Sequence, residues 1–170
     1  RLVGSEMCIR DRDMASPKAM NRLVQGDVGS GKTVIAELAM YKTVKAGFQA
    51  VMMAPTELLA KQHFASLKRD FESLGIEVDL LCSSLKTKEK QLALERLEAG
   101  VTNILVGTHA IIQPGVKFKS LGIVVTDEQH RFGVNQRSML AEKGNNPNVL
   151  VMTATPIPRT LAVILYGDLD

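Results

Sequence analysis

A glycine-rich run near the start of the sequence has the residue types and the spacing of a phosphate-binding loop. It matches GxxxxGK followed by Ser or Thr at every fixed position, and reads Gly26-Asp27-Val28-Gly29-Ser30-Gly31-Lys32-Thr33. Glycines let the backbone bring its N–H groups against phosphate oxygens. The positive N-terminal end of a following helix also attracts the negatively charged phosphates. In this pattern the lysine reaches the β- and γ-phosphates, and the threonine hydroxyl ligates Mg²⁺. The run therefore predicts a site for a nucleoside triphosphate, most simply ATP, in which the side chains of Lys32 and Thr33 bind the phosphates and Mg²⁺.

Two adjacent carboxylates form a second chemical element. Asp127 and Glu128 come directly after the apolar, β-rich run Gly122–Thr126. Carboxylates at the end of a buried strand are costly unless a metal ion or water satisfies them. Asp127 is predicted to hold Mg²⁺, directly or through water, and Glu128 to polarise the attacking water. The catalytic candidates are thus Lys32, Asp127 and Glu128, against the alternative that both acids lie in a solvated turn.

Apolar runs alternate with stretches of helical period, and this alternation must position both elements. It predicts an α/β fold with a parallel sheet whose strand ends gather the ligands at one edge. The predicted strands are Arg22–Gln25, Ala50–Ala54, Glu77–Leu81, Asn103–Val106, Gly122–Thr126 and Val149–Met152. The predicted helices are Lys32–Ala46, Glu57–Ser73, Lys86–Glu98, Val134–Glu142 and Arg159–Leu165. Thr87 is the expected cap of the third helix, a position from which Glu89 is not at capping-box spacing.

Composition fits one soluble domain. The chain has 170 residues, 45% hydrophobic and 23% charged, with a net charge of +3 that permits a nucleic-acid partner without arguing for one. No apolar run reaches membrane-spanning length, so no membrane association is expected. Two cysteines, Cys8 and Cys82, suit a reducing cytoplasm, and Cys82 is expected to pack at a strand end. The three histidines offer no helical metal-binding pair, so a zinc-type site is not predicted.

The first twelve residues differ in character from the rest. Arg1–Arg12 have neither an apolar period nor a helix cap, and they resemble the translation of a sequencing-library adapter. We expect them to be non-native and the domain to cover residues 13–170.

Five segments resemble the conserved motifs of superfamily 2 helicases, in the same order. These are Gly26–Thr33 (motif I), Ala54–Ala60 (motif Ia), Gly107–Ile111 (the next DNA-contacting motif), Asp127–His130 (a DExH-type motif II) and Thr153–Pro156 (motif III). Further runs resemble the RecG family of bacterial ATP-dependent DNA helicases over residues 13–170. These runs are Met20–Gln25, Arg131–Arg137, Thr153–Leu161 and Tyr166–Asp170. Transcription-repair coupling translocases share several of these runs and are the runner-up.

The resemblance implies the first RecA-like lobe of a helicase motor, a three-layer αβα sandwich that uses ATP and Mg²⁺. By the same resemblance the parent protein remodels branched DNA, such as stalled forks and junctions, in repair and recombination. The implied DNA-backbone contacts are Pro55, Thr56, Glu57, Gly107, Thr108 and His109. The implied residues for coupling ATP hydrolysis to DNA are Gln129, His130, Thr153 and Thr155.

We expect the chain to be a fragment that lacks the second motor lobe and the wedge domain. On that basis it should bind nucleotide weakly and hydrolyse it slowly or not at all, because the second lobe supplies arginine fingers. Two other classes of protein are alternatives. The first is a different P-loop enzyme: a GTPase would need an NKxD run, which does not occur, and a P-loop kinase would need a lid over its acceptor. A non-enzymatic, nucleotide-gated interaction module fits poorly with an intact Lys32, Thr33, Asp127 and Glu128.

Overall fold

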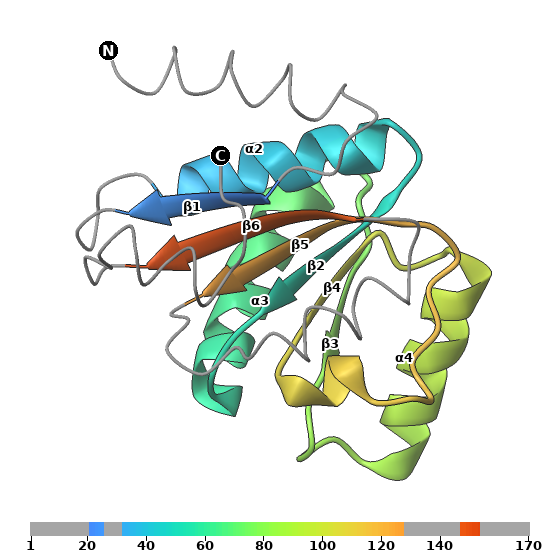
Figure 1. Cartoon of the computed structure of the whole chain (residues 1–170). Coiled ribbons are helices and arrows are strands. Elements are labelled where there is room, and N and C mark those ends of the chain that lie inside the picture. Colours follow the sequence, from blue (N-terminus) through green and yellow to red (C-terminus); the bar gives the residue numbers. More distant parts are fainter. Residues whose placement is uncertain (1–20, 26–31, 128–146, 154–170) are drawn as a thin grey trace.

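The computed structural model of the chain describes residues 21–25, 32–127 and 147–153, which build one sheet with helices packed on both faces (Figure 1). All six predicted strands are present, with ends that differ by no more than two residues, as strand boundaries commonly do. They are β1 Asn21–Gln25, β2 Gln49–Met53, β3 Val78–Leu81, β4 Ile104–Gly107, β5 Leu121–Asp127 and β6 Asn148–Thr153.

The strands lie in the order β1-β6-β5-β2-β4-β3, and every pairing between them is parallel. The arrowheads in Figure 1 accordingly point the same way. The registers align the ends of the strands to within one residue, so that Gln25 pairs with Thr153, Asp127 with Met152, and Met53 with both Thr126 and Gly107. The segments that follow these strands therefore leave the sheet at one edge, which we call the carboxyl edge.

Two helices cover one face of the sheet. These are α2 Lys32–Lys45 and α3 Glu57–Glu72, both close to their predicted bounds. Their apolar residues pack against alternate strand residues, such as Ala50 and Met52 in β2 and Ile123 and Val125 in β5. The period of two along a strand and the helical period of α2 and α3 thus meet in one continuous core.

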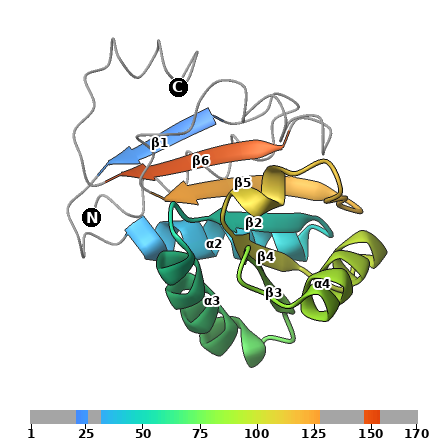
Figure 2. The ribbon, with the colours of Figure 1, turned by 90° about the horizontal axis from the view of Figure 1, so that it is seen from below.

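The opposite face is covered by α4 Thr87–Ala99 and by a short 3-10 turn, η1 His109–Ile112. Leu97 of α4 and Ile111 of η1 pack against the other strand residues, such as Val51 and Val124. Seen from below, α3 and α4 flank β3 (Figure 2). This arrangement confirms the predicted three-layer αβα fold. The predicted helices Val134–Glu142 and Arg159–Leu165 lie outside the described residues, as do residues 1–12.

Helix ends follow local hydrogen bonding. Thr56 is the N-cap of α3, and its Oγ1 accepts a hydrogen bond from the Leu59 N–H at 3.3 Å. The expected cap of α4, Thr87, is wrong by one residue. Lys86 is the N-cap there, and Glu89 Oε2 accepts its backbone N–H at 3.0 Å. Because lysine has no acceptor to return, Glu89 supplies only the reciprocal half of a capping box.

A buried glutamine connects three parts of the fold. Gln49 is 4% exposed, and its Nε2 donates to the carbonyls of Leu97 and Thr102, each at 2.9 Å. Its Oε1 accepts the Ser120 N–H at 3.0 Å. The start of β2 is thereby tied to the end of α4 and to the segment that enters β5.

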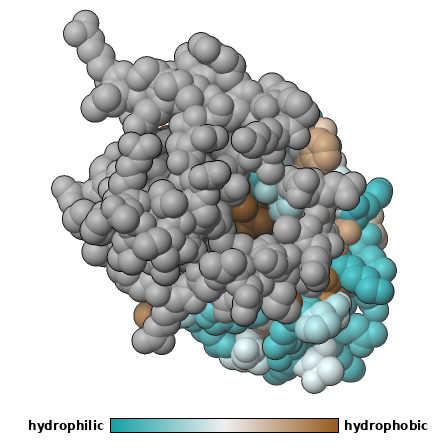
Figure 3. Space-filling view, in the orientation of Figure 1, coloured by the Kyte–Doolittle hydropathy of each residue, from teal (hydrophilic) through white to brown (hydrophobic). Residues whose placement is uncertain are grey.

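The described surface over α4 is mainly hydrophilic (Figure 3). No helix among the described residues combines the length and the apolar character needed to cross a membrane.

Candidate nucleotide and DNA site

The carboxyl edge brings together the segments in which the sequence places chemistry. β1 ends at Gln25, directly before the glycine-rich loop, and β5 ends at Asp127. One strand, β6, lies between them and ends at Thr153. With strands about 4.8 Å apart, Gln25 and Asp127 are separated by about 10 Å across the sheet. That span suits a phosphate chain held at one end and a metal-binding carboxylate at the other.

Asp127 is held by a histidine from the neighbouring helix. The Nε2 atom of His63 in α3 lies 2.7 Å from Oδ2 of Asp127, and both side chains are 19% exposed. Strand alternation places Asp127 on the same face as Ile123 and Val125, which is the face that α3 covers. The carboxylate is therefore partly buried, accessible, and anchored by a side chain distant in sequence.

Sequence reasoning tested His63 only as a metal ligand and missed this contact. The signal was present, because His63 shares the helical stripe of Ala60 and Leu67, both buried. A polar residue on the apolar face of a helix needs a partner when buried. Among the described residues no group of three or more His, Cys, Asp or Glu could hold a metal ion.

The first turn of α2 faces the same region. Thr33, the predicted Mg²⁺ ligand, is exposed in that turn, and Lys32 is the first residue of the helix. The hydroxyl of Thr33 and the carboxylate of Asp127 are hard oxygen donors, which suit Mg²⁺ when phosphate oxygens and waters complete its shell.

One turn further along α2, burial raises the pKa of Glu37, and the nearby Asp70 carboxylate raises it further.

The segment after β2 starts α3. Pro55 and Thr56 are exposed, which leaves the Thr56 hydroxyl hydrogen available to a ligand while its oxygen caps the helix. Glu57 Oε1 accepts the Ser84 N–H at 3.0 Å. Hydrogen bonding to Ser84, first through its side chain and then through its backbone N–H, lowers the pKa of Glu57. Thr56 thus has a structural role as the cap of α3.

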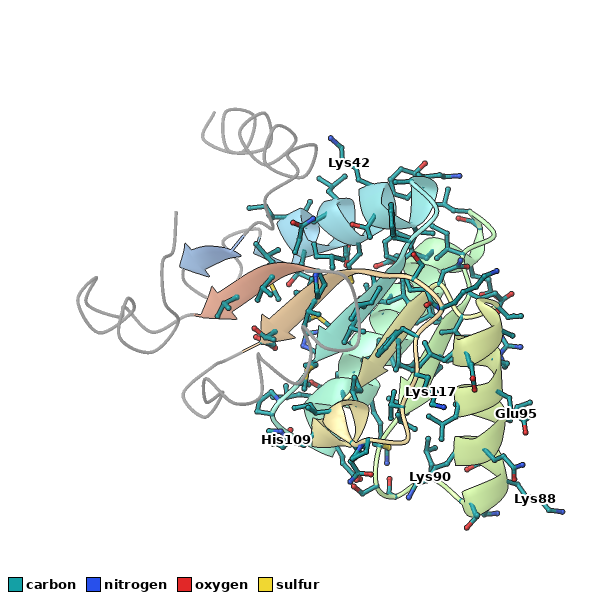
Figure 4. All side chains as sticks on the ribbon, turned by 45° about the vertical axis from the view of Figure 1, so that its right-hand side comes forward. Lys42, Lys88, Lys90, Glu95, His109 and Lys117 are labelled. Carbon is teal, nitrogen blue, oxygen red and sulfur yellow. The ribbon has the colours of Figure 1, made fainter. Side chains whose placement is uncertain are left out.

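The segment after β4 combines packing with exposure. Gly107 is the last residue of β4, and a Cβ there would lie 2.1 Å from the Leu81 carbonyl oxygen, so packing alone requires glycine. Thr108 is 7% exposed, whereas His109 is exposed at the start of η1 (Figure 4). A side-chain contact to a ligand from this segment therefore falls to His109.

Other predicted residues lie partly or wholly outside the description. Thr153 ends β6 beside Gln25. Gly26, Asp27, Val28, Gly29, Ser30, Gly31, Glu128, Gln129, His130 and Thr155 lie outside the described residues. Cys82 is fully buried directly after β3, as expected for a packed strand-end cysteine.

Comparison with known proteins identifies the group to which this arrangement belongs. The family model described as DEAD/DEAH box helicase matches residues 9–164. The chain belongs to this helicase family. The predicted likeness to RecG helicases is confirmed by individual relatives.

The ATP-dependent DNA helicase RecG of Bacillus subtilis is 58% identical over 158 residues, which are 93% of this chain and 23% of that protein. RecG of Staphylococcus aureus is 55% identical over 94% of this chain and 23% of its own length. The chain thus spans about a quarter of the length of these curated relatives.

Solved structures agree with the sequence comparison. A structure of RecG bound to a three-way DNA junction matches with a TM-score of 0.79 and 46% identity, over 94% of this chain and 21% of that one. The Mycobacterium smegmatis helicase Lhr, bound to single-stranded DNA and AMP-PNP, matches with a TM-score of 0.62. At 15% identity, the second match supports the fold alone.

Proposed function

We propose that this chain is the ATP-binding motor lobe of an ATP-dependent DNA helicase or translocase that remodels branched DNA. The observation that carries the proposal is Asp127 at the carboxyl edge, two strands from the start of a complete phosphate loop, in a chain 58% identical to a RecG helicase. The RecG structure bound to a three-way junction supports branched DNA as the substrate class.

At the nucleotide site, the backbone of Gly26–Gly31 and the side chain of Lys32 bind the phosphates, and Thr33 and Asp127 would hold Mg²⁺. The metal ion would there neutralise charge that develops on the phosphates. Glu128 orients the attacking water, and Gln129, His130, Thr153 and Thr155 relay the state of this site to DNA.

At the DNA site, the phosphates of the DNA backbone lie along the protein segments that follow β2 and β4. Exposed groups at the start of α3, Pro55 and Thr56, and at the start of η1, His109, support this placement because they share one edge of the sheet. Glu57, Gly107 and Thr108 hold these segments in position. Hydroxyl and backbone N–H groups contact phosphate without reading bases, which suits a motor that acts on DNA shape.

ATP turnover measured on the full-length gene product with and without a synthetic three-way junction tests the proposal. Turnover should rise with the junction and fall to background in Lys32→Ala, because this lysine is the point charge that binds the β- and γ-phosphates. Junction-independent turnover, or unchanged turnover in Lys32→Ala, would contradict the proposal. The chain of residues 1–170 by itself should bind ATP and show little turnover.

A further inference from the structure

The contact between His63 and Asp127 joins α3 to the end of β5, and the two residues are 64 positions apart in the sequence. His63 lies on the inward stripe of α3, with Ala60 before it and Leu67 after it, so the backbone of the helix directs the imidazole at the sheet. Asp127 lies at the end of β5 on the face that α3 covers. The geometry of helix and strand, not a flexible side chain at the surface, sets the distance of 2.7 Å.

The chemistry of the pair defines the proton position. An ionised carboxylate only accepts hydrogen bonds, so Nε2 of His63 carries the hydrogen and donates it to Oδ2 of Asp127. A nitrogen that carries a hydrogen has no lone pair for a metal ion, so His63 cannot itself be a ligand through Nε2. A carboxylate has about four acceptor positions on its two oxygens, so a hydrogen bond from His63 does not by itself exclude a metal ion.

We propose that His63 is a positioning residue for Asp127, which it orients for Mg²⁺ binding without touching nucleotide or metal. The proposal rests on the nucleotide and Mg²⁺ site proposed above. A partner of this kind fixes the rotamer of a ligating carboxylate, and losing one commonly costs tenfold to a hundredfold in metal affinity. Both side chains are only 19% exposed, which favours the contact because few waters compete for it.

The test measures how much Mg²⁺ the chain needs to bind ATP. Residues 1–170 are titrated with MgCl₂ at a fixed concentration of a fluorescent ATP analogue, and the same binding is measured in EDTA. His63→Leu should raise the Mg²⁺ midpoint roughly tenfold or more and leave binding in EDTA unchanged. Gln62→Leu is the matched control, because Gln62 is an exposed neighbour on the same helix. Its midpoint should equal that of the unsubstituted chain.

Two conservative variants separate positioning from packing. The side-chain nitrogen of Gln reaches as far as Nε2 of histidine, whereas that of Asn reaches only as far as Nδ1. His63→Gln should therefore restore most of the Mg²⁺ affinity, and His63→Asn should not. This comparison also decides the question if His63→Leu fails to fold.

The outcomes separate the two proposals. If the unsubstituted chain binds the analogue with no dependence on Mg²⁺, or if Lys32→Ala binds it equally well, the nucleotide site itself is wrong. If Mg²⁺-dependent binding is present but His63→Leu keeps the same midpoint, only the positioning role is wrong. The positioning role would also be overturned if His63→Leu lost the same affinity for the analogue in Mg²⁺ and in EDTA. Equal Mg²⁺ midpoints for His63→Gln and His63→Asn would overturn it as well.

Discussion

Glu57 Oε1 accepts a hydrogen bond from the Ser84 N–H at 3.0 Å. Glu57 is the first residue of α3, and Ser84 lies between β3 and α4, so the bond joins two of the segments at the carboxyl edge. A carboxylate would repel a DNA phosphate, and here the Glu57 carboxylate instead connects the start of α3 to the segment that follows β3. We therefore infer that the neighbouring Thr56 carries the phosphate contact in this segment.

Substitutions at Thr56 separate helix capping from DNA binding. Thr56→Ala removes the acceptor for the Leu59 N–H and should destabilise the chain by about 1 kcal/mol. Thr56→Asp keeps a good cap, so stability should be retained, but its negative charge should weaken binding to a forked DNA. Urea unfolding of the chain and fluorescence anisotropy on the full-length product measure the two effects.

Thr87→Ala is the control for capping, because Thr87 lies in the first turn of α4, where Lys86 is the cap. Its stability should stay within about 0.5 kcal/mol of the unsubstituted chain. Unweakened DNA binding by Thr56→Asp would remove Thr56 from the DNA site and leave it a cap alone.

Gln49→Leu should be among the most destabilising single changes in the described core. The substitution keeps the bulk of the side chain but removes the partner of the Thr102 carbonyl and of the Ser120 N–H. The Leu97 carbonyl keeps the Gly100 N–H as a donor. Unsatisfied buried groups cost roughly 1–3 kcal/mol each, so a loss of about 2 kcal/mol or more is expected. Urea midpoints measure it, with the exposed Gln91→Leu as control. A loss under about 1 kcal/mol would show that water replaces the amide.

The contribution of Glu57 to stability should depend on pH. Hydrogen bonding to the side chain of Ser84, and then to its N–H, lowers the pKa of Glu57 below its ordinary value of 4.5, so the folded chain binds this proton less tightly than the unfolded chain. The stabilisation is thus present above pH 4.5 and is lost as the pH falls through the folded pKa. Glu57→Gln keeps an acceptor but has no charge, so it should be less stable than the unsubstituted chain at neutral pH.

Unfolding free energies measured from pH 7 to about pH 3 test this, since acidic side chains titrate in that range. The difference between the two chains should narrow towards acid. Glu98→Gln, an exposed acid on α4, corrects for the general change in charge. A difference that stays constant with pH would mean that charge has no part in the bond to Ser84.

The strands and the described helices could be predicted from the sequence, and so could the position of Asp127 at the end of a strand. Periods of two and of 3.6 residues, the Thr56 cap and the glycine-rich loop are local features, so they are visible in a few neighbouring residues. The alternation of strand and helix also predicts that parallel strands bring their carboxyl ends to one edge. It was therefore possible to expect the loop before α2 and Asp127 to meet without knowing the order of the strands.

Other features depend on which elements become neighbours. The place of β6 between β1 and β5, the need for glycine at 107 beside Leu81, and the bonds of Gln49 join residues far apart in the chain. The cap of α4 shifted to Lys86 because Glu89 could reach that backbone N–H. The contact of His63 with Asp127 arises in the same way. Periodicity shows that His63 faces inward, but only the packing of α3 across the sheet decides which carboxylate it meets.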